Sequence, residues 1–121
     1  MILRSRRPSR TTYTLKLSNK KRYIVFQLIT QGKFTQRDLE EALREAVKDF
    51  MGSVWLSLAN PRLIFFDPER MEGVISTNRE GYKVVIASTS RLKHVKDQEL
   101  LLIPLRTTGS LKKAKKLIGS R

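Results

Sequence analysis

The sequence predicts an α+β fold, a βαββαβ sandwich with one antiparallel sheet, followed by a short basic helix at the C-terminus. Two observations predict it. Four largely apolar segments alternate in that order with two segments of helical periodicity. Pro61 and Pro104 fall in the second and fourth of the extended segments, and a proline in a sheet belongs at an edge or a bulge. The ferredoxin-like or RRM-like sheet places these same two strands at its edges.

The 121 residues suit one domain, which at this length buries roughly two-thirds of the surface that its unfolded chain exposes. Residues 1–21 lack apolar periodicity and are rich in Arg and Lys, so we expect a flexible basic arm. Residues 22–121 are then a single ferredoxin-like domain, with its C-terminal helix at about 110–118.

The first half of this domain predicts a strand and a helix. RYIVFQLIT, residues 22–30, is β-branched and aromatic without a breaker, which is typical of a strand. Residues 35–51 have apolar side chains at helical spacing, with Thr35 as N-cap, Asp38 as its capping-box partner and Gly52 just after the end. Five of the eleven acidic residues lie in this helix, so it is the surface least suited to a polyanion.

The second half predicts three further strands and two helices. SVWLSLANPRLIFFDP, residues 53–68, is expected to be extended, and DPERMEG then closes a hairpin onto a strand at 73–77. A helix begins at Thr77 or Asn78, with Tyr82, Val85, Ile86 and Thr89 on one side.

HVKDQ, residues 94–98, is expected to be a loop before the fourth strand at 99–107. Ser110 caps the last helix, which has Leu111, Ala114 and Ile118 on one face and four lysines elsewhere.

The first, second and fourth strands are apolar on both faces, although a sheet covered on one face only should alternate apolar and polar residues. Something therefore covers the second face: the terminal helix, a protein partner or a second copy. The side chains expected to meet a partner are Tyr23, Val25, Ile29, Phe66, Leu101 and Ile103.

The charge is concentrated at the two ends of the chain. There are 25 Lys and Arg against 11 Asp and Glu, a net charge of +14. Residues 1–22 hold eight basic and no acidic residues, 100–121 hold six and none, and 23–99 hold eleven of each. A neutral middle with two cationic ends is typical of a polyanion-binding protein, whereas solubility alone does not need ends free of acids.

Several classes of function are excluded or disfavoured. The chain has no cysteine and a single histidine, His94, so thiolate metal sites and a His-based triad are not expected. There is no P-loop, and Asp67 with Glu72 is better explained by a turn than by a metal site. No apolar run approaches the ~20 residues that cross a bilayer, and we expect a cytoplasmic protein with no catalytic residue, metal or cofactor of its own.

After these exclusions, the remaining candidate function is binding to the phosphate backbone of an RNA. The strand GVIST has no aromatic residue for base stacking, which disfavours single-strand recognition by the sheet. Basic side chains and the start of the last helix can meet phosphates instead, although its lysines could also be a plain solvated face. The predicted RNA contacts are Arg22, Arg79, Lys83, Arg106, Gly109, Ser110, Lys112, Lys113, Lys115 and Lys116.

An ordered set of short motifs between Arg22 and Lys116 carries a family resemblance. The set comprises Arg22-Tyr23-Ile24, Phe26, Gly52, Pro61, Leu63-Ile64, Phe66-Asp67, Gly73, Arg79-Glu80, Arg106 and Thr108-Gly109-Ser110-Leu111-Lys112. With these spacings the chain resembles the Pop-Rpp family of small protein subunits of archaeal ribonuclease P (protein component 2), which has a eukaryotic counterpart also found in ribonuclease MRP.

The resemblance implies a non-catalytic subunit of the ribonuclease P endoribonuclease. In that family the RNA is the catalyst and uses Mg²⁺, and the protein supports its catalytic domain in removing 5′ leaders from precursor tRNA. It also implies a barrel-shaped protein partner, in a heterotetramer. Ser76 stands where the family leads us to expect a basic residue, so one RNA contact is missing or moved. Alternatives are a ribosome-associated RNA-binding protein with the same sheet and a self-contained nuclease that uses Asp67 or Glu72.

Overall fold

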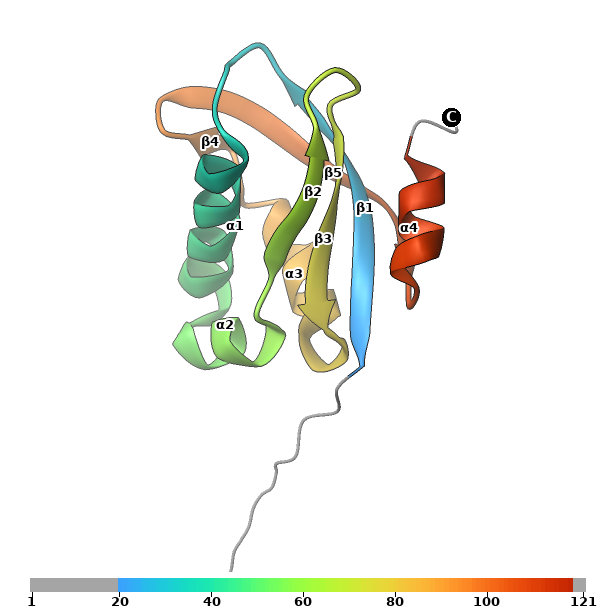
Figure 1. The fold of residues 1–121 in the computed structure, drawn as a ribbon. Coiled ribbons are helices and arrows are strands. Elements are labelled where there is room, and N and C mark those ends of the chain that lie inside the picture. The colour runs from blue at the N-terminus through green and yellow to red at the C-terminus, as the bar shows by residue number, and fades with distance from the viewer. Residues whose placement is uncertain (1–19, 119–121) are drawn as a thin grey trace, which may run out of the picture.

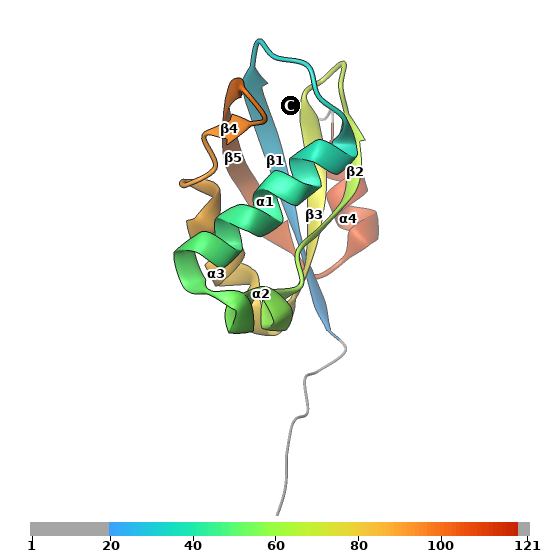
Figure 2. The same cartoon turned by 90° about the vertical axis from the view of Figure 1, so that its left-hand side faces the viewer.

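A computed structural model describes residues 20–118 and has an antiparallel sheet between two layers of helices (Figure 1). Seen from the side in Figure 2, α1, α2 and α3 lie in front of the sheet and α4 lies behind it. The predicted arm falls outside the described residues except for Lys20 and Lys21. The elements are β1 (Lys21–Thr30), α1 (Gln36–Met51), α2 (Ser53–Ala59), β2 (Arg62–Asp67), β3 (Glu72–Asn78), the 3-10 helix η1 (Arg79–Gly81), α3 (Tyr82–Thr89), β4 (His94–Val95), β5 (Gln98–Thr108) and α4 (Leu111–Leu117).

The order of the strands confirms the predicted ferredoxin-like fold. It runs β2-β3-β1-β5-β4, and every neighbouring pair is antiparallel. The second and fourth predicted strands, β2 and β5, therefore flank β3 and β1. The two-residue β4 pairs only with Gln98 and Glu99, so for most of its length β5 is the edge that its proline predicted.

Pro104 fits this position because its missing N–H is not needed there. The Leu100 N–H donates to the Lys93 carbonyl at 2.9 Å, on the side away from β1. In an antiparallel ladder every second residue has the same orientation, so the backbone groups of Leu102 and Pro104 also point away from β1. The register of β1 and β5 shifts next to this proline, since Phe26 pairs with Pro104 and Val25 with Arg106.

The main core lies between the sheet and helices α1 to α3. Ile24, Phe26 and Leu28 of β1 are at most 2% exposed and pack against Leu39 and Leu43 of α1 within one cluster. The α1 helix begins as predicted, because the Thr35 side chain accepts from the Asp38 N–H at 3.0 Å and the Thr35 N–H donates to the Asp38 carboxylate.

The prediction of an extended segment from residue 53 is wrong over its first half, because Ser53–Ala59 is the helix α2. Gly52 has φ 98°, which turns the chain sharply out of α1, and Asn60, at φ 44°, ends α2 in the left-handed conformation. Ala59 is fully buried, and a Cβ added to Gly81 would lie 2.6 Å from the Ala59 Cα. Close packing of α2 on η1 therefore outweighs the β propensity of the local sequence.

Two smaller predictions also need correction. The loop predicted at 94–98 contains β4, which reverses into β5 through Lys96, at φ 56°, and Asp97. The prediction that Phe66 lies on the open face of the sheet is wrong, because Phe66 packs in the main core with its ring 6.3 Å from that of Phe26. The register of β2 shifts between Leu63 and Phe65, so the strict alternation that the prediction assumed does not hold.

Candidate nucleic-acid interface

Three basic segments that are far apart in the sequence meet where β1 begins. They are the start of β1, η1 with the start of α3, and the loop from β5 into α4. The Arg79 N–H donates to the Lys20 carbonyl at 3.1 Å, which ties η1 to the start of β1. The Lys21 Nζ donates to the Asn78 side-chain oxygen at 2.7 Å across the same junction. The loop from β5 into α4 reaches this end as well, because Tyr23 pairs with Thr108 in the ladder.

Arg22 links these segments through its side chain. Its guanidinium carbon lies 5.9 Å from the centre of the Tyr82 ring, a cation–π distance, at the start of α3. A Cβ added to Gly109 would lie 3.5 Å from the Arg22 Nη1, so this arginine also borders the turn before α4. Arg22 stays partly exposed, and its charge remains available to a ligand.

The α4 helix has two different faces. Ala114 is fully buried in a second apolar cluster with Val25 and Val74, so α4 covers the centre of the second face of the sheet. This outcome confirms the terminal helix as one cover for that face. The four lysines of α4 are all exposed: Lys112, Lys113, Lys115 and Lys116.

The start of α4 is largely occupied by its own cap. The Ser110 hydroxyl accepts from the Lys113 N–H at 3.2 Å, and the Ala114 N–H donates to the Ser110 carbonyl at 3.0 Å. The helix is also only seven residues long. The lysine side chains are therefore better suited to hold a phosphate than the backbone N–H groups at this helix start.

Seven of the ten predicted RNA contacts lie on the three segments that meet at this end, and we call this surface the basic end. Arg106 lies further up the sheet, opposite Val25, and Lys115 and Lys116 lie in the last turn of α4. Lys20 and Lys21 also belong to this surface and are not among the predicted contacts, although the antiparallel pairing of residues 22–30 with 73–77 would have been the signal for them. The basic end comprises Lys20, Lys21, Arg22, Arg79, Lys83, Gly109, Ser110, Lys112 and Lys113.

Acidic residues are concentrated on a different surface. The α1 carboxylates of Asp38 and Glu40 form ion pairs with Lys96 at 3.7 Å and with Arg62 at 3.1 Å. The α1 helix lies across the sheet from α4 (Figure 1). The molecule therefore has a basic surface at one side and an acidic helix on the other, as the distribution of charge in the sequence predicts.

The carboxylates of the hairpin between β2 and β3 have structural roles. The Asp67 Oδ1 accepts from the Glu69 N–H at 2.9 Å, which is typical of a turn, and Asp67 also forms an ion pair with Arg70. Glu72, its neighbour in the ladder, is only 6% exposed. Within residues 20–118, no group of three His, Asp or Glu side chains could hold a metal ion, and no helix is long and apolar enough to cross a membrane.

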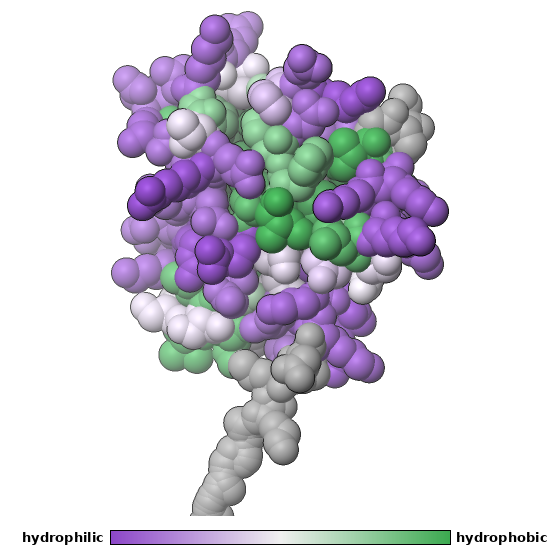
Figure 3. All heavy atoms as spheres, in the orientation of Figure 1, coloured by the Kyte–Doolittle hydropathy of each residue, from purple (hydrophilic) through white to green (hydrophobic). Residues whose placement is uncertain are grey.

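The second face of the sheet is only partly covered by α4. Of the residues predicted to meet a partner, Tyr23 and Val25 lie beneath α4, whereas Ile29, Leu101 and Ile103 remain exposed. Ile64 on β2 is also 40% exposed, and hydrophobic residues gather between the β2 edge and α4 in Figure 3. Apolar surface thus remains for a partner on either side of α4.

Comparisons with known proteins show which family the chain matches. The model of the Rpp14/Pop5 family matches residues 22–118. Ribonuclease P protein component 2 of Sulfurisphaera tokodaii is 48% identical over 116 residues, which cover 92% of this chain and 93% of the relative. The protein of the same name from Saccharolobus solfataricus is 51% identical over 104 residues, 86% of this chain and 73% of the relative. A chain in the cryo-EM structure of yeast ribonuclease MRP has a TM-score of 0.58 at 15% identity, with 79% of each chain covered, and so shares the fold.

Proposed function

This chain belongs to the Rpp14/Pop5 family, and we propose on this basis that it is a non-catalytic protein subunit of ribonuclease P. In this role it binds and stabilises the catalytic domain of the ribonuclease P RNA and so supports removal of 5′ leaders from precursor tRNA. The archaeal relatives near 50% identity, which are named as ribonuclease P protein component 2, support the assignment.

The observation that carries the proposal is the convergence of three basic segments at one end of the fold. Each lysine or arginine that meets a phosphate releases counterions, which is the main source of affinity for a folded RNA. Arg22, positioned between Tyr82 and Gly109, gives this surface a fixed point, and the lysines of α4 extend it. Such a surface lowers the repulsion between RNA segments and recognises their shape rather than their sequence.

In this proposal the RNA, and not the protein, catalyses the cleavage of precursor tRNA. The RNA uses Mg²⁺ for cleavage, and this protein binds no cofactor and provides no catalytic residue. The turn hydrogen bonds of Asp67 support this assignment over a self-contained nuclease, because they give that carboxylate a structural role. Purified protein alone should therefore leave precursor tRNA intact, and cleavage that is lost in Asp67→Asn would contradict the assignment.

The proposal also includes a protein partner and a place of action. We propose that the chain assembles with a barrel-shaped subunit of the same particle, as a heterotetramer with two copies of each, in the cytoplasm. The apolar residues that α4 leaves exposed support a protein partner, because a monomer seldom exposes a continuous apolar patch without a use for it.

Footprinting of the ribonuclease P RNA tests the RNA-binding part. With the wild-type chain, protection from hydroxyl radicals should appear in the catalytic domain of the RNA. A chain with Lys112→Ala and Lys113→Ala should protect the same nucleotides less, whereas Lys48→Ala on α1 should not change the footprint. Protection confined to the rest of the RNA, or none at all, would contradict the proposal.

A further inference from the structure

Trp55, the only tryptophan of the chain, lies on α2 outside both apolar clusters of residues 20–118. It is partly exposed, and within that part of the chain its indole has no hydrogen bond, stacked ring or cation–π partner. A tryptophan offers a large apolar surface, and proteins usually bury that surface or use it to bind something. The core does not account for Trp55, so a ligand for its ring has to be considered.

The exposure of Trp55 follows from the way in which α2 packs. Leu56 and Ala59, three residues apart, belong to the main core. Trp55 and Leu58 are also three residues apart, so they share a different face of α2, and both stay partly exposed outside the two clusters. Val54 beside them is 72% exposed, and α2 contains no charged residue. This face is therefore a neutral apolar surface that neither core uses.

The end of α2 is bonded directly to the basic end. The Asn78 side-chain amide donates to the Leu58 carbonyl at 2.8 Å, while its oxygen accepts from the Lys21 Nζ at 2.7 Å. The hydroxyl of Thr77, a fully buried residue, donates to the Ala59 carbonyl at 2.7 Å. In Figures 1 and 2, α2 lies at the end of the molecule where β1 begins. The last turn of α2 is therefore held in a fixed place beside the basic end.

The other aromatic rings in the described part of the chain are already in use. Two of them lie against arginines, since Arg22 covers Tyr82 and Arg91 lies 4.9 Å from the centre of the Phe50 ring. The rest pack in one of the two apolar clusters: Tyr23, Phe26, Phe34, Phe65 and Phe66. Among residues 20–118, Trp55 is therefore the aromatic side chain whose ring is left for a ligand.

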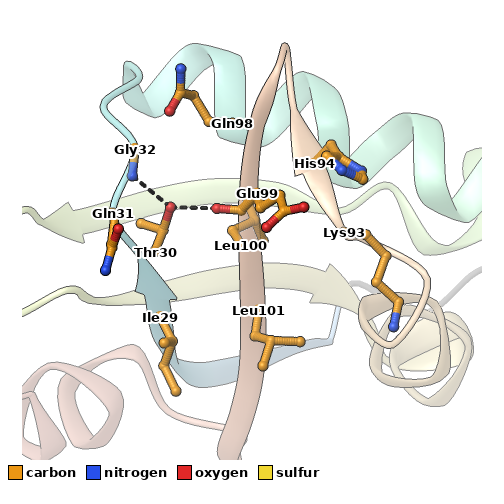
Figure 4. A pocket seen from close by; sticks show the side chains of 10 residues that line it. All are labelled: Ile29, Thr30, Gln31, Gly32, Lys93, His94, Gln98, Glu99, Leu100 and Leu101. Carbon is orange, nitrogen blue, oxygen red and sulfur yellow. Dashed lines mark hydrogen bonds between the residues drawn. The ribbon is translucent and has the colours of Figure 1, made fainter.

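A hollow at the other end of β1 lacks these properties. It has a volume of about 820 Å³ and is lined by residues such as Thr30, Glu99 and Leu101 (Figure 4). The ten residues of the described chain that line it include no Phe, Tyr or Trp, and Glu99 adds a negative charge. The hollow is thus poorly suited to a nucleotide, in contrast to the face of Trp55 beside the basic end.

We propose that Trp55 is the stacking platform for one unpaired base of the RNA whose backbone lies on the basic end. An indole ring stacks on any base, and unpaired bases in loops and bulges are the ones that a protein can reach in a folded RNA. An RNA fits this position better than a protein subunit, because Asn78 holds both α2 and Lys21, and a backbone that reaches Lys21 runs beside α2. The inference rests on the proposed function in assuming that the basic end holds RNA.

Tryptophan fluorescence of the full chain tests the proposal directly, since all of the emission comes from Trp55. Titration with a single-stranded RNA of about eight nucleotides should quench the emission until binding is saturated, because a stacked base quenches the indole. A duplex of the same sequence has no unpaired base, so it should bind the basic end with much less quenching.

Substitutions on α2 separate stacking from charge. Trp55→Ala should weaken binding of the single strand about tenfold and leave the slope of log K against log salt unchanged, because it removes a stacked base and no contact to phosphate. Trp55→Phe keeps a ring and should bind nearly as well as the wild type, which also controls for a loss of folding in Trp55→Ala. Val54→Ala, one residue away and highly exposed, is the matched control and should bind like the wild type.

Equal affinity of Trp55→Ala and the wild type for the single strand would overturn the inference, as would equal quenching by the duplex and the single strand. An emission that responds to another protein subunit of the particle, but not to RNA, would assign the ring to that subunit instead. The hydroxyl-radical footprint on the ribonuclease P RNA distinguishes the two levels. Backbone protection by the wild-type chain without any effect of Trp55→Ala means that only this inference fails, whereas no protection by the wild-type chain means that the proposed function fails.

Discussion

The guanidinium of Arg22 lies over the ring of Tyr82, 5.9 Å from its centre, and joins the start of β1 to the start of α3. The same guanidinium borders Gly109, where β5 leads into α4. This one partly exposed side chain of the first segment therefore lies beside the other two segments of the basic end, so its position depends on the fold as a whole.

Two substitutions of Arg22 distinguish the effect of its positive charge from that of its planar guanidinium group. Arg22→Lys keeps the charge but loses the planar group over Tyr82, so the melting temperature should fall slightly while the salt dependence of RNA binding stays the same. Arg22→Ala should also reduce the slope of log K against log salt by about one. Equal slopes for Arg22→Ala and the wild type, measured by filter binding at several salt concentrations, would show that Arg22 does not contact phosphate.

The lysines of α4 give a second prediction for RNA affinity. Lys112→Ala and Lys113→Ala should each reduce the salt slope by about one, because each removes one contact to phosphate. Lys48→Ala removes the same charge from the acidic helix α1 and is the matched control. An unchanged slope in both α4 variants would mean that these lysines are only a solvated face.

Elements whose signals lie in neighbouring residues could be predicted from the sequence, and elements that depend on tertiary packing could not. The capping box of Thr35 and Asp38 and the strand 22–30 are local features, and the structure confirms both. The helix at Ser53–Ala59 could not be predicted in this way, because its sequence favours a strand and its packing against α1, α3 and η1 selects a helix. Phe66 was misplaced for a related reason, since a bulge in β2 depends on how the strand pairs with β3.

The close packing of α2 against η1 can be tested through two glycines. Gly81→Ala would overlap Ala59 and should lower the free energy of unfolding by about 1–3 kcal/mol, because neither backbone can easily move away. Gly109→Ala makes the same chemical change where the nearest atom is the flexible end of Arg22, 3.5 Å away, and should have little effect. Equal urea midpoints for the two variants would contradict this account of α2.

The capping box of α1 gives a prediction for stability that does not involve burial. Thr35 is exposed, so Thr35→Ala removes its hydrogen bond to the Asp38 N–H without opening a cavity, and stability should fall by about 1 kcal/mol. Thr35→Ser keeps the hydroxyl and should be close to the wild type. A Thr35→Ser variant as unstable as Thr35→Ala, by chemical denaturation, would show that the methyl group rather than the cap matters.

The sequence shows where the charged residues of the basic end lie along the chain, but it does not show which of them come together in the folded protein. The excess positive charge lies in residues 1–22 and 100–121. The contribution of Arg79 and Lys83, which come from the neutral middle of the chain, depends on the pairing of β3 with β1, which brings η1 beside Lys20. The structure is also needed to see which part of the second face of the sheet α4 covers and which part stays exposed, at Ile29, Leu101 and Ile103. The length of an apolar strand does not show how much of it a helix covers.

The measurement that tests the central claim most directly is cleavage of precursor tRNA by ribonuclease P reconstituted from its RNA and protein subunits, with and without this chain, at moderate Mg²⁺. The account predicts that omission lowers the cleavage rate and that higher Mg²⁺ partly restores it, because added cations replace the charge of the basic end. A cleavage rate that is the same with and without the chain across the Mg²⁺ range would contradict the account.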